Sequence, residues 1–140
     1  MRTLGLDVGD RRIGVALSDS LGITAQRLAV LERRGESNDL DAVAALAQDH
    51  QAGAVVVGLP LMMNGTVGEQ AKKVTAFAEA LKRRVACPVH LVDERLTTVQ
   101  SERALLETDT RRAKRKQVID QVAAQLILQA YLDGQAHRQS

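Results

Sequence analysis

The sequence predicts an α/β fold, in which a mixed five-stranded sheet is flanked by helices. Three strand-like segments come first and are joined by short turns, and the rest of the chain alternates between helix-like and strand-like segments. Strands joined by a hairpin are antiparallel and strands joined through a helix are parallel, so the sheet should contain both kinds of pairing. The length of 140 residues fits a single domain over 1–140.

The three N-terminal strands are predicted from their apolar pattern. Over 4–8, apolar residues alternate with Gly5 and Asp7, which is the period of a strand with two different faces. A turn leads to a second apolar segment over 13–17, and the two should form a hairpin. A third strand is expected over 23–31.

The middle of the chain predicts a helix and then a buried strand. The helix should begin near Ser37 or Asn38, because both are common N-cap residues, and should end before Gly53. The run over 54–57 is continuously apolar, which is typical of a strand covered on both faces.

A second helix and a last strand follow. Thr66 and Glu69 have the spacing of a capping box, so we expect a helix from there to about Arg84. The last strand should cover 89–92 and end just before Glu94.

The composition is that of a soluble globular protein, with 45% apolar and 26% charged residues. No stretch approaches the roughly 18 consecutive apolar residues of a membrane span, and an acid at position 7 interrupts any export signal. Cys87 is the only cysteine, so neither a disulfide nor a cysteine zinc site can form within the chain. We therefore expect a cytoplasmic protein with no membrane partner.

Basic residues are concentrated although the formal net charge is only +2. One dense run is expected to contact phosphates, whereas the pairs elsewhere are typical of solvated helix ends and turns. With one phenylalanine, one tyrosine and no tryptophan, the chain lacks a platform for stacking bases. Nucleic acid should therefore be bound through phosphates, sugars and shape. The basic run consists of Arg111, Arg112, Lys114, Arg115 and Lys116.

Two acidic residues stand at the ends of predicted strands. Asp7 lies near the end of the first strand, and Glu94 lies just beyond the last. Ligand sites of α/β sheets form beyond the carboxyl ends of strands, so these two side chains can converge on one site.

A third acid, Asp120, lies on the apolar side of the predicted final helix, which should run over about 114–132 and end at Gly134. An aspartate there is costly unless it is paired or binds a metal. An i−4 salt bridge with Lys116 is the alternative, but it contributes only a few tenths of a kcal/mol if exposed, so metal coordination explains the position better. At about 100° per residue, the same helix face carries Ala123, Ala124, Ile127 and Tyr131.

Three carboxylates without an accompanying pair of histidines suit Mg²⁺ or Mn²⁺. Two such ions about 4 Å apart can activate a water and stabilise the leaving oxygen of a phosphodiester. The basic run just before Asp120 would bring a phosphate backbone to them, so the sequence predicts a metal-dependent nuclease with Asp7, Glu94 and Asp120 as catalytic residues and metal ligands.

Other candidate sites are weaker. The three histidines lack ligand spacing, Cys87 lacks an identifiable base, and the early glycines do not follow the G-x-G-x-x-G spacing of a dinucleotide site. We therefore predict no further cofactor-binding site.

Four blocks of the sequence resemble the YqgF family of ribonuclease H-like proteins, which are described as nucleases of pre-16S rRNA or as Holliday junction resolvases. The D-x-G motif alone is unspecific, but the four blocks in this order are highly specific. They are Leu6-Asp7-Val8-Gly9 with Arg12-Ile13-Gly14-Val15-Ala16, Val57-Gly58-Leu59-Pro60 with Asn64-Gly65, Val92-Asp93-Glu94-Arg95-Leu96-Thr97-Thr98, and Lys116 with Ile119-Asp120 and Ala123-Ala124.

The resemblance implies a ribonuclease H-like fold and metal-dependent cleavage, and it implies the same three acidic residues. It also implies trimming of the 5′ end of precursor small-subunit ribosomal RNA, with cleavage of a branched DNA junction as the close alternative. We assign Arg95, in the third block, to nucleic-acid binding together with the basic run.

Three other interpretations stay open at this stage. A junction resolvase should be a two-fold homodimer, because it makes paired cuts, whereas an RNA nuclease can be a monomer. A non-catalytic RNA-binding module would need the basic surface but not the acids. An ATPase of the actin and hexokinase type also begins with a D-x-G strand, but such proteins clasp nucleotide between two domains, and this chain has the length of one.

Overall fold

The computed structural model of the chain describes residues 1–97, 99 and 112–139, with side chains of the last helix described from 120 to 136. A single mixed sheet with strand order β3-β2-β1-β4-β5 forms its centre, as the sequence predicts. The strands are β1 (Arg2–Val8), β2 (Arg12–Ser18), β3 (Ala25–Glu32), β4 (Ala52–Leu59) and β5 (Val89–Asp93). The helices are α1 (Glu36–Asp49), α2 (Glu69–Lys82), the 3₁₀ helix η1 (Glu94–Leu96) and α4 (Arg112–Gln139).

The two kinds of strand pairing divide the sheet at β1. β1 pairs antiparallel with β2, which pairs antiparallel with β3, because short turns connect these strands. β1 pairs parallel with β4, and β4 pairs parallel with β5, because a helix connects each pair. The carboxyl ends of β1, β4 and β5 therefore lie at the same edge of the sheet.

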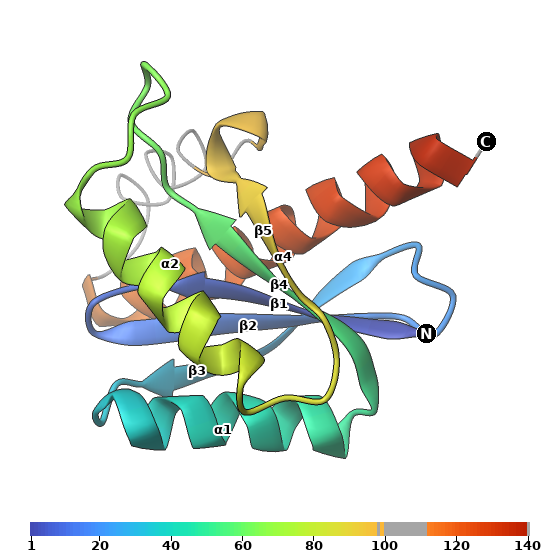
Figure 1. Cartoon of the computed structure of the whole chain (residues 1–140), viewed down its shortest axis with the longest axis horizontal. Helices are drawn as coiled ribbons and strands as arrows, with labels where there is room; N and C mark the ends of the chain where they lie inside the picture. Colours follow the sequence, from blue (N-terminus) through green and yellow to red (C-terminus); the bar gives the residue numbers. More distant parts are fainter. Residues whose placement is uncertain (98, 100–111, 140) are drawn as a thin grey trace.

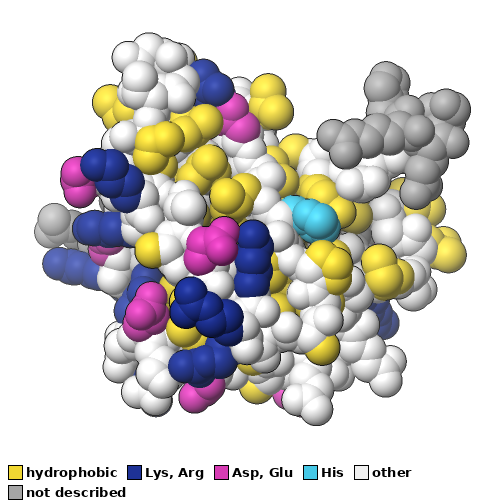
Figure 2. All heavy atoms as spheres, viewed as in Figure 1, with side chains coloured by type: hydrophobic (Ala, Val, Ile, Leu, Met, Phe, Trp, Pro, Cys, Tyr) yellow, Lys and Arg dark blue, Asp and Glu magenta, His cyan; other side chains and the backbone are white. Residues whose placement is uncertain are grey.

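Helices cover both faces of the sheet (Figure 1). α1 and α2 lie on one face, where they pack on Leu4, Leu6 and Val57 among other aliphatic residues. α4 lies on the opposite face and packs on Ala16 and Val56. Acidic and basic side chains lie beside one another on the outer surface of α1 and α2 (Figure 2). The ion pairs of this surface join Lys82 to Glu79, and Arg84, just beyond α2, to Asp41 of α1.

Both predicted helix caps are wrong. α1 begins at Glu36 after Gly35, and in the described part of the chain no side chain caps it. α2 begins at Glu69 after Gly68, because Thr66 instead donates its hydroxyl to Asn64 Oδ1 at 2.7 Å within the preceding loop. Glycine can occupy an N-cap position, and local side-chain bonds compete with capping.

The predicted end of the last helix is also wrong, because α4 continues through Gly134 to Gln139. A single glycine inside a helix costs only about 1 kcal/mol, and the residues that follow include good helix formers such as Gln135 and Ala136. Among the helices of the described residues, none combines the length and apolar character that crossing a bilayer requires.

Candidate active site

Asp7 is buried on the face of the sheet that α4 covers. Successive residues of a strand point to opposite faces, so Leu6 and Val8 join the core under α1 and α2 while Asp7 points the other way. Its relative exposure is 6%. In the antiparallel register Asp7 lies opposite Gly14 of β2, which leaves space beside its side chain.

Gly14 allows the backbone of α4 to rest directly on the sheet. A Cβ atom at position 14 would lie 2.0 Å from the carbonyl oxygen of Asp120, a distance that no real contact allows. Paired residues of neighbouring strands point to the same face, so this close approach places Asp120 next to Asp7. As predicted, Asp120 adjoins the buried apolar side of α4, which includes Ala124 and Ile127.

Glu94 reaches the same place from the other side of the sheet. It begins η1 directly after β5, and its relative exposure is 4%. Because β4 lies between β5 and β1, the two strands are roughly 10 Å apart. Gly58 of β4 leaves the gap that Glu94 needs, since a Cβ atom there would lie 2.9 Å from Glu94 Oε1.

The three acids line one cavity of about 270 Å³ at the carboxyl edge of the parallel strands. The structure thus brings Asp7, Glu94 and Asp120 together from β1, η1 and α4. The sequence pattern predicted that these acids converge, but it did not predict that Gly14 and Gly58 leave the space they need. A glycine in a buried strand is itself a sign that another group approaches closely. The cavity is lined by Asp7, Val8, Gly9, Gly58, Pro60, Gln70, Glu94 and Asp120.

The chemistry of these side chains fits a hard divalent cation. Within the described residues, no three histidine, cysteine or carboxylate side chains stand close enough to form a complete ligand cluster by themselves. Mg²⁺ does not need one, because it usually binds through one or two carboxylates together with waters and substrate phosphate oxygens. Carboxylates on separate elements around a cavity of this size fit that mode of binding.

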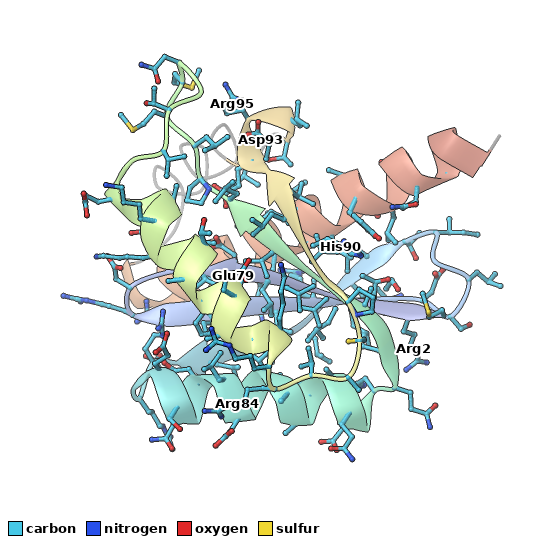
Figure 3. All side chains as sticks on the ribbon, in the orientation of Figure 1. Arg2, Glu79, Arg84, His90, Asp93 and Arg95 are labelled. Carbon is cyan, nitrogen blue, oxygen red and sulfur yellow. The ribbon has the colours of Figure 1, made fainter. Side chains whose placement is uncertain are left out.

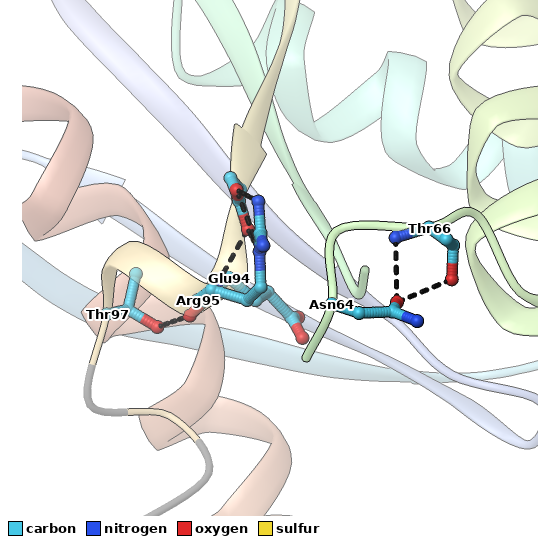
Figure 4. A network of polar contacts seen from close by, with 6 residues as sticks. Asn64, Thr66, Glu94, Arg95 and Thr97 are labelled. Carbon is cyan, nitrogen blue, oxygen red and sulfur yellow. Dashed lines mark hydrogen bonds and ion pairs between the residues drawn. The ribbon is translucent and has the colours of Figure 1, made fainter. Parts of the chain in front are cut away.

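The short helix that carries Glu94 is held at both ends (Figure 4). Asp93 Oδ1 accepts a hydrogen bond from the backbone N–H of Arg95 at 2.9 Å, and Thr97 donates its hydroxyl to the carbonyl of Glu94 at 2.7 Å. These bonds fix the backbone from which the Glu94 carboxylate projects.

Arg95 is ion-paired with Asp93 at 2.7 Å (Figure 3). The hydrogen bond from the guanidinium is the main cause of a lowered pKa at Asp93, and the backbone bond adds to it. Since Asp93 compensates much of the charge, Arg95 offers a nucleic acid less attraction than the sequence alone suggests. Its predicted role in nucleic-acid binding stays a prediction.

The turn after Asp7 is fixed by a residue that sequence reasoning missed. Arg33 donates from Nη1 to the carbonyl of Gly9 at 2.7 Å and from Nε to Asp39 at 2.6 Å. The guanidinium also lies over the ring of Phe77, 5.4 Å from its centroid. A sequence pattern cannot reveal such contacts, because they join three separate elements.

Gln70, in the first turn of α2, was also missed. It lines the acidic cavity, and its amide donates to the carbonyl of Val8 at 3.4 Å. Its position follows from the start of α2 at Glu69, which the capping box predicted within a few residues.

The described part of the basic run, from Arg112 onward, lies at the start of α4. Arg111 and the side chains of Arg112, Lys114, Arg115 and Lys116 lie outside the described residues, as does the alternative salt bridge of Asp120 with Lys116. Phosphate contact by this run therefore stays a prediction.

The structure explains two residues for which the sequence predicts no catalytic role, His90 and Cys87. His90 of β5 stacks on Tyr131 of α4, with ring centroids 5.7 Å apart (Figure 3). Burial raises the pKa of the Cys87 thiol, which disfavours the reactive thiolate.

Comparison with known protein sequences identifies a matching family and close relatives. Residues 1–134 match the family described as "RuvX: Holliday junction resolvase". A relative from Moorella thermoacetica, named "Putative pre-16S rRNA nuclease", is 56% identical over 133 residues, which are 95% of each chain. A relative of the same name from Clostridium novyi is 50% identical over 134 residues, which are 96% of this chain and 99% of the other.

Solved structures confirm the ribonuclease H-like fold. Thermus thermophilus RuvC, in complex with a Holliday junction substrate, superposes with a TM-score of 0.62 at 11% identity, over 98% of this chain and 96% of the other. The fowlpox virus Holliday junction resolvase has a TM-score of 0.56 at 14% identity, over 96% and 99%.

Proposed function

The chain belongs to the RuvX (YqgF) family, and on this premise we propose that it is a metal-dependent nuclease that processes the 5′ end of pre-16S rRNA. The observation that carries the proposal is the cavity shared by Asp7, Glu94 and Asp120. The names of the relatives from Moorella thermoacetica and Clostridium novyi support the RNA substrate.

The three carboxylates would hold Mg²⁺ or Mn²⁺ as two ions. The chemistry supplied by the bound ions is stabilisation of the charge that develops on the attacking and leaving oxygens of a phosphodiester. The protein contributes position. Gly14 and Gly58 leave room beside the acids, and the bonds around Arg33 and Asp93 hold the backbone next to Asp7 and Glu94.

The lining of the cavity suits the reacting phosphate rather than a base. Three of the eight described lining residues are acidic, and none of the eight is aromatic. We place the bases and the rest of the backbone outside it. We assign the flanking phosphates mainly to the basic run over 111–116, which precedes Asp120 in the sequence, and to a lesser degree to Arg95, whose charge is paired with Asp93.

We further propose that residues 1–140 form one nuclease domain that acts in the cytoplasm. The family match over 1–134 includes all five strands of the sheet, which supports a single unit.

A Holliday junction resolvase is the second candidate, because the family description names that activity. A resolvase places two active sites on one junction through a two-fold dimer, so it requires a stable homodimer in solution.

A cleavage assay separates these functions. The purified chain is incubated with end-labelled pre-16S rRNA or with a four-way DNA junction, in Mg²⁺, in Mn²⁺ or in chelator. We expect metal-dependent cleavage of the RNA and none by Glu94→Gln. Paired cuts in the junction together with a dimeric mass would favour the resolvase, and binding without cleavage in either metal would favour a non-catalytic module.

A further inference from the structure

Four large apolar side chains are exposed on the two chain segments that follow Pro60 and Glu94, which line the acidic cavity. Met62, Met63 and Val67 lie in the loop between β4 and α2, and Leu96 ends η1. Their relative exposures are 55%, 77%, 53% and 78%. Hydrophobic side chains gather around this loop in the upper left of Figure 2. We call Met62, Met63, Val67 and Leu96 the rim patch.

The rim patch is joined to the cavity by both of its chain segments. The loop leaves the cavity at Pro60, which lines it, and Leu96 lies two residues after Glu94. The two segments also touch each other, because a Cβ atom at Gly65 would lie 3.2 Å from Arg95 Nη1. A strand that leaves the cavity along these two segments would meet the rim patch.

The loop is ordered by its own hydrogen bonds. The N–H of Met62 donates to the carbonyl of Thr66 at 3.0 Å, and the N–H of Gly65 donates to the carbonyl of Met62 at 2.8 Å. Asn64 Oδ1 accepts from both the backbone and the hydroxyl of Thr66 (Figure 4). Gly65 has a φ of 86°, which glycine adopts without strain. These bonds order the backbone that carries the two methionines.

Nucleobases are the ligand class that suits such a patch. The two aromatic residues of the chain are committed elsewhere, since Phe77 is buried in the core and Tyr131 stacks on His90. Methionine thioethers make favourable contacts with aromatic rings, and methionine and leucine side chains act as wedges between base steps in other nucleic-acid-binding proteins. The rim patch can therefore provide the contact with nucleobases that exposed aromatic side chains provide in other proteins.

We propose that the rim patch receives unstacked bases that flank the phosphodiester held in the acidic cavity. The substrate then has unpaired nucleotides at the cleavage position, rather than an uninterrupted duplex. This inference rests on the proposed function, because it needs a nucleic-acid strand in the cavity. It adds an apolar contact to the phosphate and shape recognition that the composition predicts.

The test compares binding of two RNAs in chelator, so that no cleavage occurs. One RNA carries 2-aminopurine in a single-stranded segment beside the mapped cleavage position, and the other has the same sequence fully paired. For the parent we expect a change in 2-aminopurine emission and a preference for the single-stranded form. For the double variant Met62→Ser/Met63→Ser, we expect about tenfold weaker binding of the single-stranded form, loss of the emission change and unchanged binding of the duplex.

Matched variants control for exposure and for the fold. Leu96→Ser should act like the methionine double variant, whereas Leu21→Ser should have no effect, although both leucines are 78% exposed. Met62→Leu/Met63→Leu keeps the apolar surface and should retain the binding preference. Thermal melts should coincide for all of them, because exposed positions contribute little to stability.

Two results would overturn the proposal. One is equal binding and an equal emission change for the parent, the methionine double variant and Leu96→Ser, while the parent still cleaves RNA in Mg²⁺. This result leaves the nuclease function intact. The other is a defect of the serine variants that is limited to ribosomal particles and absent on naked RNA, which would assign the rim patch to a protein partner. Absence of cleavage and binding by the parent would instead refute the proposed function.

Discussion

The two faces of the sheet are built from different residues, and β1 contributes to both. Towards α1 and α2, β1 presents Leu4, Leu6 and Val8, which are enclosed by other large aliphatic side chains. Towards α4 it presents Gly5 and Asp7, and the neighbouring strands present Gly14 and Gly58. One face fills space with side chains, whereas the other leaves space for a helix backbone and for carboxylates.

On the proposed function, this difference means that stability and chemistry are assigned to opposite faces of one strand. Branched aliphatic residues maximise buried apolar area, which is the main favourable term in folding. Buried carboxylates work against that term and are retained for function. Substitutions on the two faces should therefore be separable by experiment.

The largest expected effect is a contrast between adjacent residues of β1. Asp7→Asn should lower cleavage more than about a hundredfold while the chain stays folded, because it removes a charged metal ligand and keeps the shape. Leu6→Ala should lower the free energy of unfolding by about 2–5 kcal/mol, because it leaves a cavity in the core. Denaturant melts and initial cleavage rates per folded molecule measure the two effects.

The contrast would be broken if Leu6→Ala, assayed under conditions where it is fully folded, lost as much cleavage as Asp7→Asn. Stability and chemistry would then not be divided between the faces. Glu94→Gln serves as a second functional variant, and Val57→Ala serves as a second core variant from β4.

The next effect concerns two glycines that α4 touches or contains. Gly14→Ala should destabilise the chain by about 3 kcal/mol and lower cleavage, because its Cβ displaces the backbone of α4 at Asp120. Gly134→Ala should stabilise it by about 1 kcal/mol and leave cleavage unchanged, since its Cβ would meet no described atom within 4 Å. Equal effects in melts of both variants would show that close packing at Gly14 is unimportant.

Metal binding at the acids should raise the free energy of unfolding of the chain. At a Mg²⁺ concentration about 100 times its dissociation constant, mass action on the folded state adds about 2.7 kcal/mol. We expect a higher melting temperature for the parent and for Leu6→Ala in Mg²⁺ than in chelator, and a smaller rise for Asp7→Asn. An equal rise in all three would place the bound metal elsewhere.

The smallest effect concerns Asp19, a carboxylate far from the cavity. A hydrogen bond from the backbone N–H of Ile23 is the main cause of its lowered pKa. Such a group stabilises the fold above the ordinary carboxyl pKa, and the contribution is lost as pH falls through the lowered pKa. Asp19→Asn should therefore be slightly less stable than the parent at pH 7 and equal to it in acid, as melts across pH would show. A pH-independent difference would mean that the charge of Asp19 is irrelevant.

The sequence predicted the elements better than their ends. The alternation over 4–8 and the apolar run over 54–57 result from burial in the sheet, so each pattern predicted its strand correctly. Helix starts depend on local competition for hydrogen bonds. Thr66 bonds to Asn64 instead of capping α2, and no periodicity reveals such a choice.

The sequence predicted that three acids converge, and the structure places Asp7, Glu94 and Asp120 around one cavity, while their catalytic role stays a prediction. The sequence did not predict the glycines that leave room beside them. An acid at a strand end or within an apolar helix face stands out because burial makes it costly. The roles of Gly14 and Gly58 depend on how closely α4 and Glu94 approach, which only tertiary packing determines. The same holds for the contact of Arg33 with Gly9.

The place of α4 after all five strands has a consequence for synthesis on the ribosome. Chains fold as they emerge, so the face of the sheet towards α4 is the last to be covered. That face carries glycines, Ala16 and Asp7 together with Val56, and these residues stay exposed until α4 has been made. The acids from β1, η1 and α4 meet only once Asp120 has been translated. On the proposed function, a growing chain therefore lacks a complete active site until synthesis of α4.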